Sequence, residues 1–144
     1  MTVMSILMLF AVSSFAQKTK GYQGIIEVGG GVCVFDVVTS QLKADFINGY
    51  KFNNQFSMGL GLGIRKFSPD FVPLVYLNFR RNLGYDKFEK VYPYIQTGIG
   101  FPVLNQSVGL AFKNVPIAIG LHGEVIPLFG AIFISVGANI GILF

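Results

Sequence analysis

The chain has 144 residues, of which 52% are hydrophobic and only 12% are charged, with 18 Gly, one Cys and no Trp. This composition excludes a disordered segment, a small disulfide-stapled protein and a multidomain enzyme. The formal net charge of +4 comes from basic residues scattered along the chain, so no nucleic-acid surface is expected.

The N-terminal segment is predicted to be a secretory signal peptide. Residues 1–16 carry no charge, an apolar run covers Val3–Val12, and small residues stand at Ser14 and Ala16, the positions that a signal peptidase reads. The run is shorter than the ~20 residues of a membrane-spanning helix. We therefore expect cleavage after Ala16 and one domain over residues 17–144. The absence of Lys and Arg from the start of the segment leaves open whether the chain begins upstream.

From Tyr22 onward, apolar residues alternate with small or polar ones, which is the period-two pattern of β-strands. In Phe56–Arg65, for example, every second residue from Phe56 to Ile64 is apolar, and the residues between them are Ser57 and three glycines. The alternation predicts strands at Tyr22–Phe35, Leu42–Phe52, Phe56–Arg65, Phe71–Leu83, Val91–Phe101, Ser107–Lys113 and Val115–Val125.

The C-terminal segment Val125–Phe144 has twenty residues without a charge, so hydropathy alone would make it a transmembrane helix. Its apolar residues instead recur at every second position from Ile132 to Phe144, with Ser135 and Asn139 among the residues between them. A helix would scatter these polar residues around its circumference, and β-branched residues with glycine are poor helix formers. We therefore predict an eighth strand.

The apolar faces of these strands are expected to point outward. The opposite faces carry mostly Gly, Ser, Asn and Tyr with a few charges, which is too small and too weakly charged a coat for a soluble sandwich or lipocalin. A membrane barrel explains both faces. Its apolar face contacts lipid, and its small, polar face fills a narrow interior. Backbone groups in lipid must all be paired, which requires closure. The predicted fold is all-β, an eight-stranded antiparallel up-and-down transmembrane β-barrel.

Charged residues on the inward faces are expected to form a salt-bridge network in the barrel lumen, because an unpaired buried charge costs several kcal/mol. The predicted network comprises Glu27, Lys43, Asp45, Lys51, Arg65, Arg80, His122 and Glu124. Cys33 is expected to be a small lumen filler.

The segments that carry a family likeness are Phe15–Gln17, Gly21–Gly24, Glu27–Gly29, Asn48–Asn53, Met58–Gly63, Asn78–Arg80 and the final Phe144. Together they resemble the small eight-stranded outer-membrane β-barrel proteins of Gram-negative bacteria, the OmpA/OmpX-like group. The resemblance implies residence in the outer membrane, contact with its lipid, and insertion by the barrel-assembly machinery. The chain end, Ile140, Ile142 and Phe144, is similar to the C-terminal signal that this machinery reads, with Ile142 where a Tyr is frequent.

An aromatic girdle is expected at the strand ends that would face the periplasm. Because Trp is absent, Tyr and Phe must build it, and the candidates are Tyr22, Tyr50, Phe52, Phe56, Tyr92 and Phe144.

No pattern indicates a catalytic, metal or cofactor site. His122 and Glu124 lie two apart on one strand face and could join a serine in the triad of a lipid-directed outer-membrane enzyme, but no Ser stands in a nucleophile motif. One His and one Cys do not suffice for a zinc site.

The sequence therefore predicts an integral outer-membrane barrel with a structural or surface-interaction role and no catalysis. Both termini are expected in the periplasm, with short loops near residues 36–41, 66–70, 102–106 and 126–130 outside the cell, where their partner is unknown. Three alternatives remain open: a narrow-pore channel, a lipid-directed enzyme using His122 and Glu124, and a soluble lipocalin-like ligand carrier.

Overall fold

The computed structural model describes residues 20–34, 38–67, 70–128 and 130–144, so the predicted signal peptide of residues 1–16 lies outside the described residues. The described ranges contain eight strands and no helix that is long and apolar enough to cross a membrane. The strands are β1 (Gly21–Val34), β2 (Val38–Lys51), β3 (Phe56–Phe67), β4 (Asp70–Asn82), β5 (Val91–Phe101), β6 (Leu104–Phe112), β7 (Ile117–Leu128) and β8 (Ala131–Leu143).

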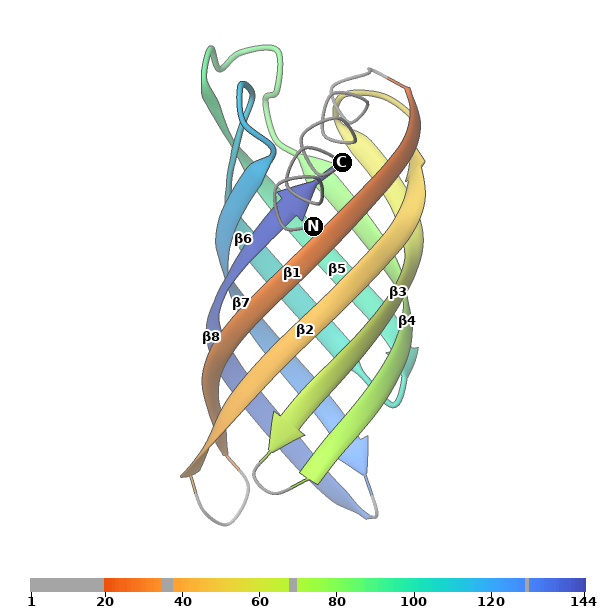
Figure 1. Cartoon of the computed structure of the whole chain (residues 1–144), viewed down its shortest axis with the longest axis vertical. Helices are drawn as coiled ribbons and strands as arrows, with labels where there is room; N and C mark the ends of the chain where they lie inside the picture. Colours follow the sequence, from red (N-terminus) through yellow and green to blue (C-terminus); the bar gives the residue numbers. More distant parts are fainter. Residues whose placement is uncertain (1–19, 35–37, 68–69, 129) are drawn as a thin grey trace, which may run out of the picture.

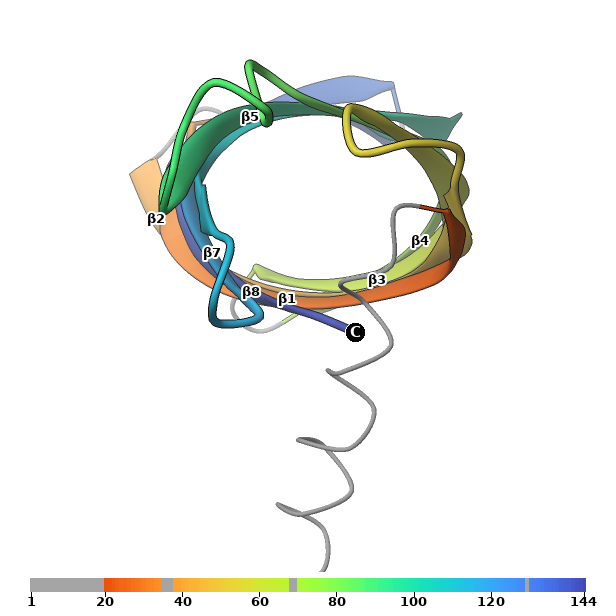
Figure 2. The same cartoon turned by 90° about the horizontal axis from the view of Figure 1, so that it is seen from above.

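These strands close into a single barrel. Each strand pairs antiparallel with the next along the chain, and β8 pairs with β1, so the sheet has no free edge. Figure 1 shows the strands inclined to the long axis of the barrel, and Figure 2 shows the closed ring from above. The predicted eight-stranded antiparallel up-and-down barrel is confirmed.

The register between the strands sets their tilt. A row of paired residues that starts at Gly24 passes once around the barrel and returns to β1 at Val34, ten residues further along. Such a stagger requires strands tilted by roughly 35–45° to the barrel axis. A strand tilted in this way needs ~9–11 residues to cross a bilayer core, and the strands here have between 9 and 14 residues.

The two ends of the barrel are different. One end, called here the terminal end, carries Phe144 and the connections 52–55, 83–90 and 113–116. The other, called the hairpin end, carries the four shorter connections β1–β2, β3–β4, β5–β6 and β7–β8. At the terminal end, Gly84 takes a positive φ of 61°, and its carbonyl accepts hydrogen bonds from the backbone of Lys87 (2.9 Å) and Phe88 (3.3 Å). The connection 83–90 therefore has a fixed turn at its start.

At the hairpin end the strands run further than the apolar pattern predicts. The expected loops at 36–41, 66–70, 102–106 and 126–130 are shortened, since β2 begins at Val38, β3 extends to Phe67, β6 begins at Leu104 and β7 extends to Leu128. In β2, Thr39 and Ser40 interrupt the apolar alternation but still pair with β1. Backbone pairing thus continues where side-chain alternation stops. β7, in contrast, begins at Ile117, two residues later than predicted.

Candidate functional site

Large apolar side chains face outward along every strand. Leu42 is 59% exposed, Leu62 50% and Leu121 65%. The outward set also includes Val28, Ile64, Val75, Leu77, Ile99, Val108, Leu110, Ile134, Val136 and Ile140. The predicted outward orientation of the apolar faces is confirmed. It is the reverse of what a soluble lipocalin-like carrier requires, because such a protein places its large apolar side chains inside.

Five inward charges form one buried group, called here the ion cluster: Glu27, Lys43, Asp45, Arg65 and Glu124. The Arg65 guanidinium donates through Nη1 to Asp45 (2.7 Å) and through Nη2 to Glu124 (2.5 Å). The Lys43 ammonium lies 3.2 Å from Asp45, 3.7 Å from Glu27 and 3.9 Å from Glu124. Since Arg65 belongs to β3 and Glu124 to β7, this pair joins opposite walls of the barrel and occupies the lumen between them.

Two glutamines extend the ion cluster. The side-chain amide of Gln41 donates to Glu124 (2.9 Å), and that of Gln96 donates to Glu27 (2.9 Å). Both glutamines are nearly fully buried. The sequence prediction omits Gln96 because the predicted network contains inward charges and His122 only, and it omits Gln41 because that residue falls in the expected loop 36–41, whereas β2 begins at Val38. The available signal was position: Gln96 alternates with the inward residues Tyr92 and Tyr94 on β5, and Gln41 stands two residues before inward Lys43.

The other three predicted network residues are buried in the lumen but lie outside the ion cluster. Arg80 is 1% exposed and donates to the amide oxygens of Asn82 (3.2 Å) and Gln96 (3.3 Å). Lys51 is 6% exposed, and its ammonium lies 5.7 Å from the centre of the Tyr85 ring. His122 is 4% exposed, and neither of its ring nitrogens has a hydrogen-bond partner among the described residues.

Small residues make the room that these side chains occupy. A Cβ at Gly63 would collide with the Asp45 carboxylate and lie 2.9 Å from Arg65 Nη1. A Cβ at Gly61 would collide with the ring of Tyr76. The glycines on the inward faces therefore permit the ion cluster and the large lumen side chains to fit inside an eight-stranded barrel.

Apolar side chains close the lumen at the hairpin end. Leu74, Val103 and Ile126 are each 1–2% exposed, and Phe67 and Phe133 pack against this group with ring centres 5.7 Å apart. Cys33, near the end of β1, is 1% exposed and carries a free thiol. These residues form an apolar layer inside the lumen at the hairpin end.

Aromatic rings gather on the outer surface at the terminal end. The Phe144 ring lies 6.5 Å from that of Tyr22 and 6.3 Å from that of Phe46, and Phe52 lies 5.2 Å from Tyr50 and 5.7 Å from Phe56. These contacts form two groups, which adjoin because Tyr22 pairs with Tyr50, and they include five of the six predicted girdle residues.

The prediction for the sixth girdle residue, Tyr92, is wrong. It is 6% exposed and points into the lumen, where its ring lies 4.8 Å from that of Tyr85. The reason is strand parity: Tyr92 shares the inward face of β5 with Tyr94 and Gln96.

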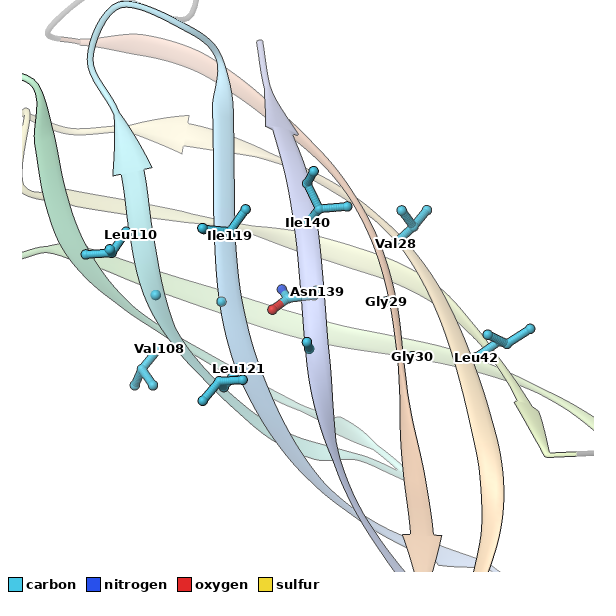
Figure 3. Close-up of a pocket in the computed structure, with 13 residues that line it drawn as sticks. Val28, Gly29, Gly30, Leu42, Val108, Leu110, Ile119, Leu121, Asn139 and Ile140 are labelled. Atoms are coloured by element: carbon cyan, nitrogen blue, oxygen red, sulfur yellow. The ribbon is translucent and has the colours of Figure 1, made fainter.

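An apolar groove of about 910 Å³ runs along the outer wall over β6, β7, β8, β1 and β2 (Figure 3). It forms where Gly30 and Ala138 stand among larger outward residues, including Leu42, Leu121 and Ile140. A Cβ at Gly30 would approach nothing closer than 3.6 Å, so a methyl group would make ordinary van der Waals contact here, and its absence lowers this part of the wall. Its outward lining is aliphatic, which suits an acyl chain and offers no group for chemistry.

One polar pair interrupts the outward apolar surface. The hydroxyl of Thr97 donates to the side-chain oxygen of Gln106 (2.9 Å) between β5 and β6. In lipid, polar side chains are tolerated where they satisfy each other, and this pair does so in part.

The residues of the enzyme alternative are close in sequence but do not form a triad. The Glu124 carboxylate is engaged by Arg65 and Gln41, and within the described residues His122 hydrogen-bonds to no serine and no carboxylate. A hydrolase triad requires the serine–histidine and histidine–carboxylate hydrogen bonds. His122 and Glu124 are therefore not arranged for nucleophilic catalysis.

Several solved structures of small β-barrels are similar to this chain. The chain is similar to neisserial surface protein A, with a TM-score of 0.62 and 10% identity over 85% of this chain and 96% of that chain. It is also similar to a de novo designed transmembrane β-barrel, with a TM-score of 0.51 and 12% identity over 85% of this chain and 95% of that one. No family model and no curated protein matches the sequence.

A third similar structure is the N-terminal β-barrel domain of OprF from Pseudomonas aeruginosa. The TM-score is 0.50 and the identity 16%, over 87% of this chain and 99% of that domain. At these identities the likeness concerns the fold, which is that of the small outer-membrane barrels.

Proposed function

We propose that this chain is an integral outer-membrane β-barrel protein of a Gram-negative bacterium, with a structural or surface-interaction role and no catalysis. The observation that carries the proposal is the reversal of the usual soluble arrangement: Arg65 and Glu124 form a fully buried ion pair inside, while residues such as Leu62 and Leu121 are at least half exposed outside. A wall of this composition is stable in lipid and not in water.

We infer the orientation in the membrane from the difference between the two ends of the barrel. The terminal end faces the periplasm, where the barrel-assembly machinery would read Ile140, Ile142 and Phe144. Ile140 and Ile142 face outward from β8, and Phe144 follows that strand directly. The hairpin end then faces the cell exterior with short connections. Such connections favour a compact envelope component or a small contact surface over a large adhesin.

Fractionation of cells that express the full chain tests the proposal. We expect the protein in the detergent-extracted outer-membrane fraction, with a gel mobility that changes when the sample is boiled, because a folded barrel resists unfolding by detergent. Recovery in the soluble fraction without detergent, and a mobility independent of boiling, would refute it.

The narrow-channel alternative has one observation in its favour. Both ring nitrogens of His122, the Ser135 hydroxyl and the Asn139 amide are buried without a partner among the described residues, and buried polar groups of this kind bind water. The Arg65–Glu124 pair and the apolar layer of Leu74 and Val103 interrupt any continuous path. A resting barrel of this kind should not conduct ions. Steady conductance in a planar bilayer that changes in Glu124→Gln would favour the channel.

A further inference from the structure

Two buried cations at the terminal end have no carboxylate partner. In the described part of the chain neither Lys51 nor Arg80 makes an ion pair, although they are only 6% and 1% exposed. The Arg80 Nη2 atom is buried without any hydrogen-bond partner among the described residues. An isolated buried cation is costly, by several kcal/mol. The interior therefore lacks an anion at this position.

The carboxylates of the ion cluster do not supply that anion. Asp45 and Glu124 are held by Arg65 and Lys43, and Glu27 is reached from Arg80 only through Gln96, which donates to Glu27 and accepts from Arg80. Glu27, Asp45 and Glu124 already outnumber the two cations that they pair with. The lumen is thus divided into an acidic layer and, nearer the terminal end, a basic layer.

The basic layer has the geometry of an anion site. Lys51 pairs in register with Ser57, and Ser57 with Arg80, so the three residues form one row across β2, β3 and β4. All three face inward and are buried. Neighbouring strands lie ~4.8 Å apart, so the ammonium, the hydroxyl and the guanidinium start from adjacent backbone positions and extend into the same part of the lumen.

Aromatic rings hold this row in place. The Arg80 guanidinium stacks on Tyr94 at 3.8 Å from the ring centre, which fixes its plane. Tyr85, from the connection 83–90, lies against Tyr92 and is approached by the Lys51 and Lys113 ammonium groups at 5.7 and 4.3 Å. The mouth of the barrel at the terminal end is therefore lined by cations and tyrosines.

We propose that the row Lys51, Ser57 and Arg80 binds a small soluble oxyanion, a phosphate or carboxylate group that enters from the terminal end. An oxyanion accepts several hydrogen bonds at once, which matches the two N–H groups of Nη2, the lysine ammonium and the serine hydroxyl. A lipid headgroup does not reach the row, because the barrel wall encloses it. The proposal requires only the barrel interior and does not depend on the cellular role of the protein.

Arginine side-chain NMR tests the proposal directly, because the chain has only three arginines: Arg65, Arg80 and Arg81. The full barrel is refolded in a phosphate-free maltoside detergent, and sodium phosphate is titrated at constant ionic strength. We expect the Nε–H signal of Arg80 to shift and saturate. Arg65, held in the ion cluster, and exposed Arg81 serve as internal references and should show no saturating shift.

Substitution at Lys51 identifies the row as the site. Lys51→Met should weaken phosphate binding about tenfold or more, as expected for the loss of one charged hydrogen bond, and Lys51→Gln replaces it if Lys51→Met does not refold. Lys66→Met, at an exposed outward position, is the matched control and should bind phosphate as the wild type does.

Three results would overturn the proposal. They are an Arg80 shift that grows linearly with phosphate like that of Arg81, an affinity unchanged by the Lys51 variants, and saturation by sodium chloride at the same concentration as by phosphate. Sodium acetate should also saturate the Arg80 signal, since a carboxylate offers the same chemistry.

Discussion

Arg65 is the central residue of the ion cluster. Its guanidinium bonds to Asp45 on β2 and to Glu124 on the opposite wall, and it is fully buried. Removal of this one side chain leaves two carboxylates with only the Lys43 ammonium as counter-charge. The energetic importance of Arg65 therefore exceeds that of any exposed charge of the chain.

We expect Arg65→Met to destabilise the barrel by about 3–5 kcal/mol, the range found when one partner of a buried ion pair is removed. Urea unfolding of the protein refolded in detergent measures the change. Lys66→Met, whose side chain lies outside near Phe71, should cost less than about 1 kcal/mol. Equal stability of Arg65→Met and wild type would show that the ion cluster is not formed.

A pair of strand glycines tests the packing of the lumen. Gly63→Ala should destabilise by about 1–3 kcal/mol, because the new methyl group would collide with the Asp45 carboxylate, which Arg65 holds in place. Gly30→Ala, on the outer wall with no atom nearer than 3.6 Å, should be neutral or stabilising by up to about 1 kcal/mol. The two urea midpoints should thus move differently. Similar shifts would contradict the assignment of inner and outer faces.

At the scale of the element, β8 closes the barrel and ends at Leu143, just before Phe144. The backbones of Phe144 and Gly24 exchange two hydrogen bonds of 2.6 and 2.9 Å, and the Phe144 ring covers Gly24, so that a Cβ at this position would displace the ring. The last residue of the chain is therefore part of the β1–β8 closure.

Phe144→Ala separates this structural role from the recognition by the assembly machinery that we propose. We expect the variant to refold in detergent with at least half of the wild-type yield, because the β8 ladder to β1 is intact, but to lose most of its heat-modifiable form in cells. Phe71→Ala, an exposed aromatic at the hairpin end, is the control and should assemble normally. Normal assembly of Phe144→Ala would contradict the role of the chain end as a signal.

The sequence predicts the strands well because apolar residues alternate with small or polar residues in every strand. It predicts their ends less well. The sequence predicts a loop at Thr39 and Ser40, although their backbones continue the ladder with β1. It predicts a strand at Val115, although β7 starts at Ile117. Side-chain pattern reports which face is buried, whereas strand ends depend on pairing with a neighbour.

The candidate site shows a similar division. Inward parity identifies Arg65 and Glu124 as lumen residues, but only the register of all eight strands brings β3 and β7 to opposite walls so that the two can meet. The same register leaves Arg80 and Lys51 away from the carboxylates. Which inward charges pair is a property of the closed barrel and is not encoded in any single strand.

In the whole molecule, the apolar side of the barrel faces outward, toward lipid. Every strand contributes large apolar side chains to the outer wall, and the ion cluster lies inside it. The interpretation of the aromatic girdle, the apolar layer at the hairpin end and the basic layer at the terminal end depends on this orientation.

Quenching of single tryptophans by brominated lipid measures this orientation most directly, because the chain has no Trp of its own. Leu62→Trp on the outer wall and Tyr76→Trp in the lumen lie at nearly the same depth, since Tyr76 pairs with Gly61 in β3. In vesicles brominated at the middle of the acyl chain, we expect strong quenching of Leu62→Trp and little of Tyr76→Trp. Equal quenching at both positions, or quenching of Tyr76→Trp alone, would contradict the account.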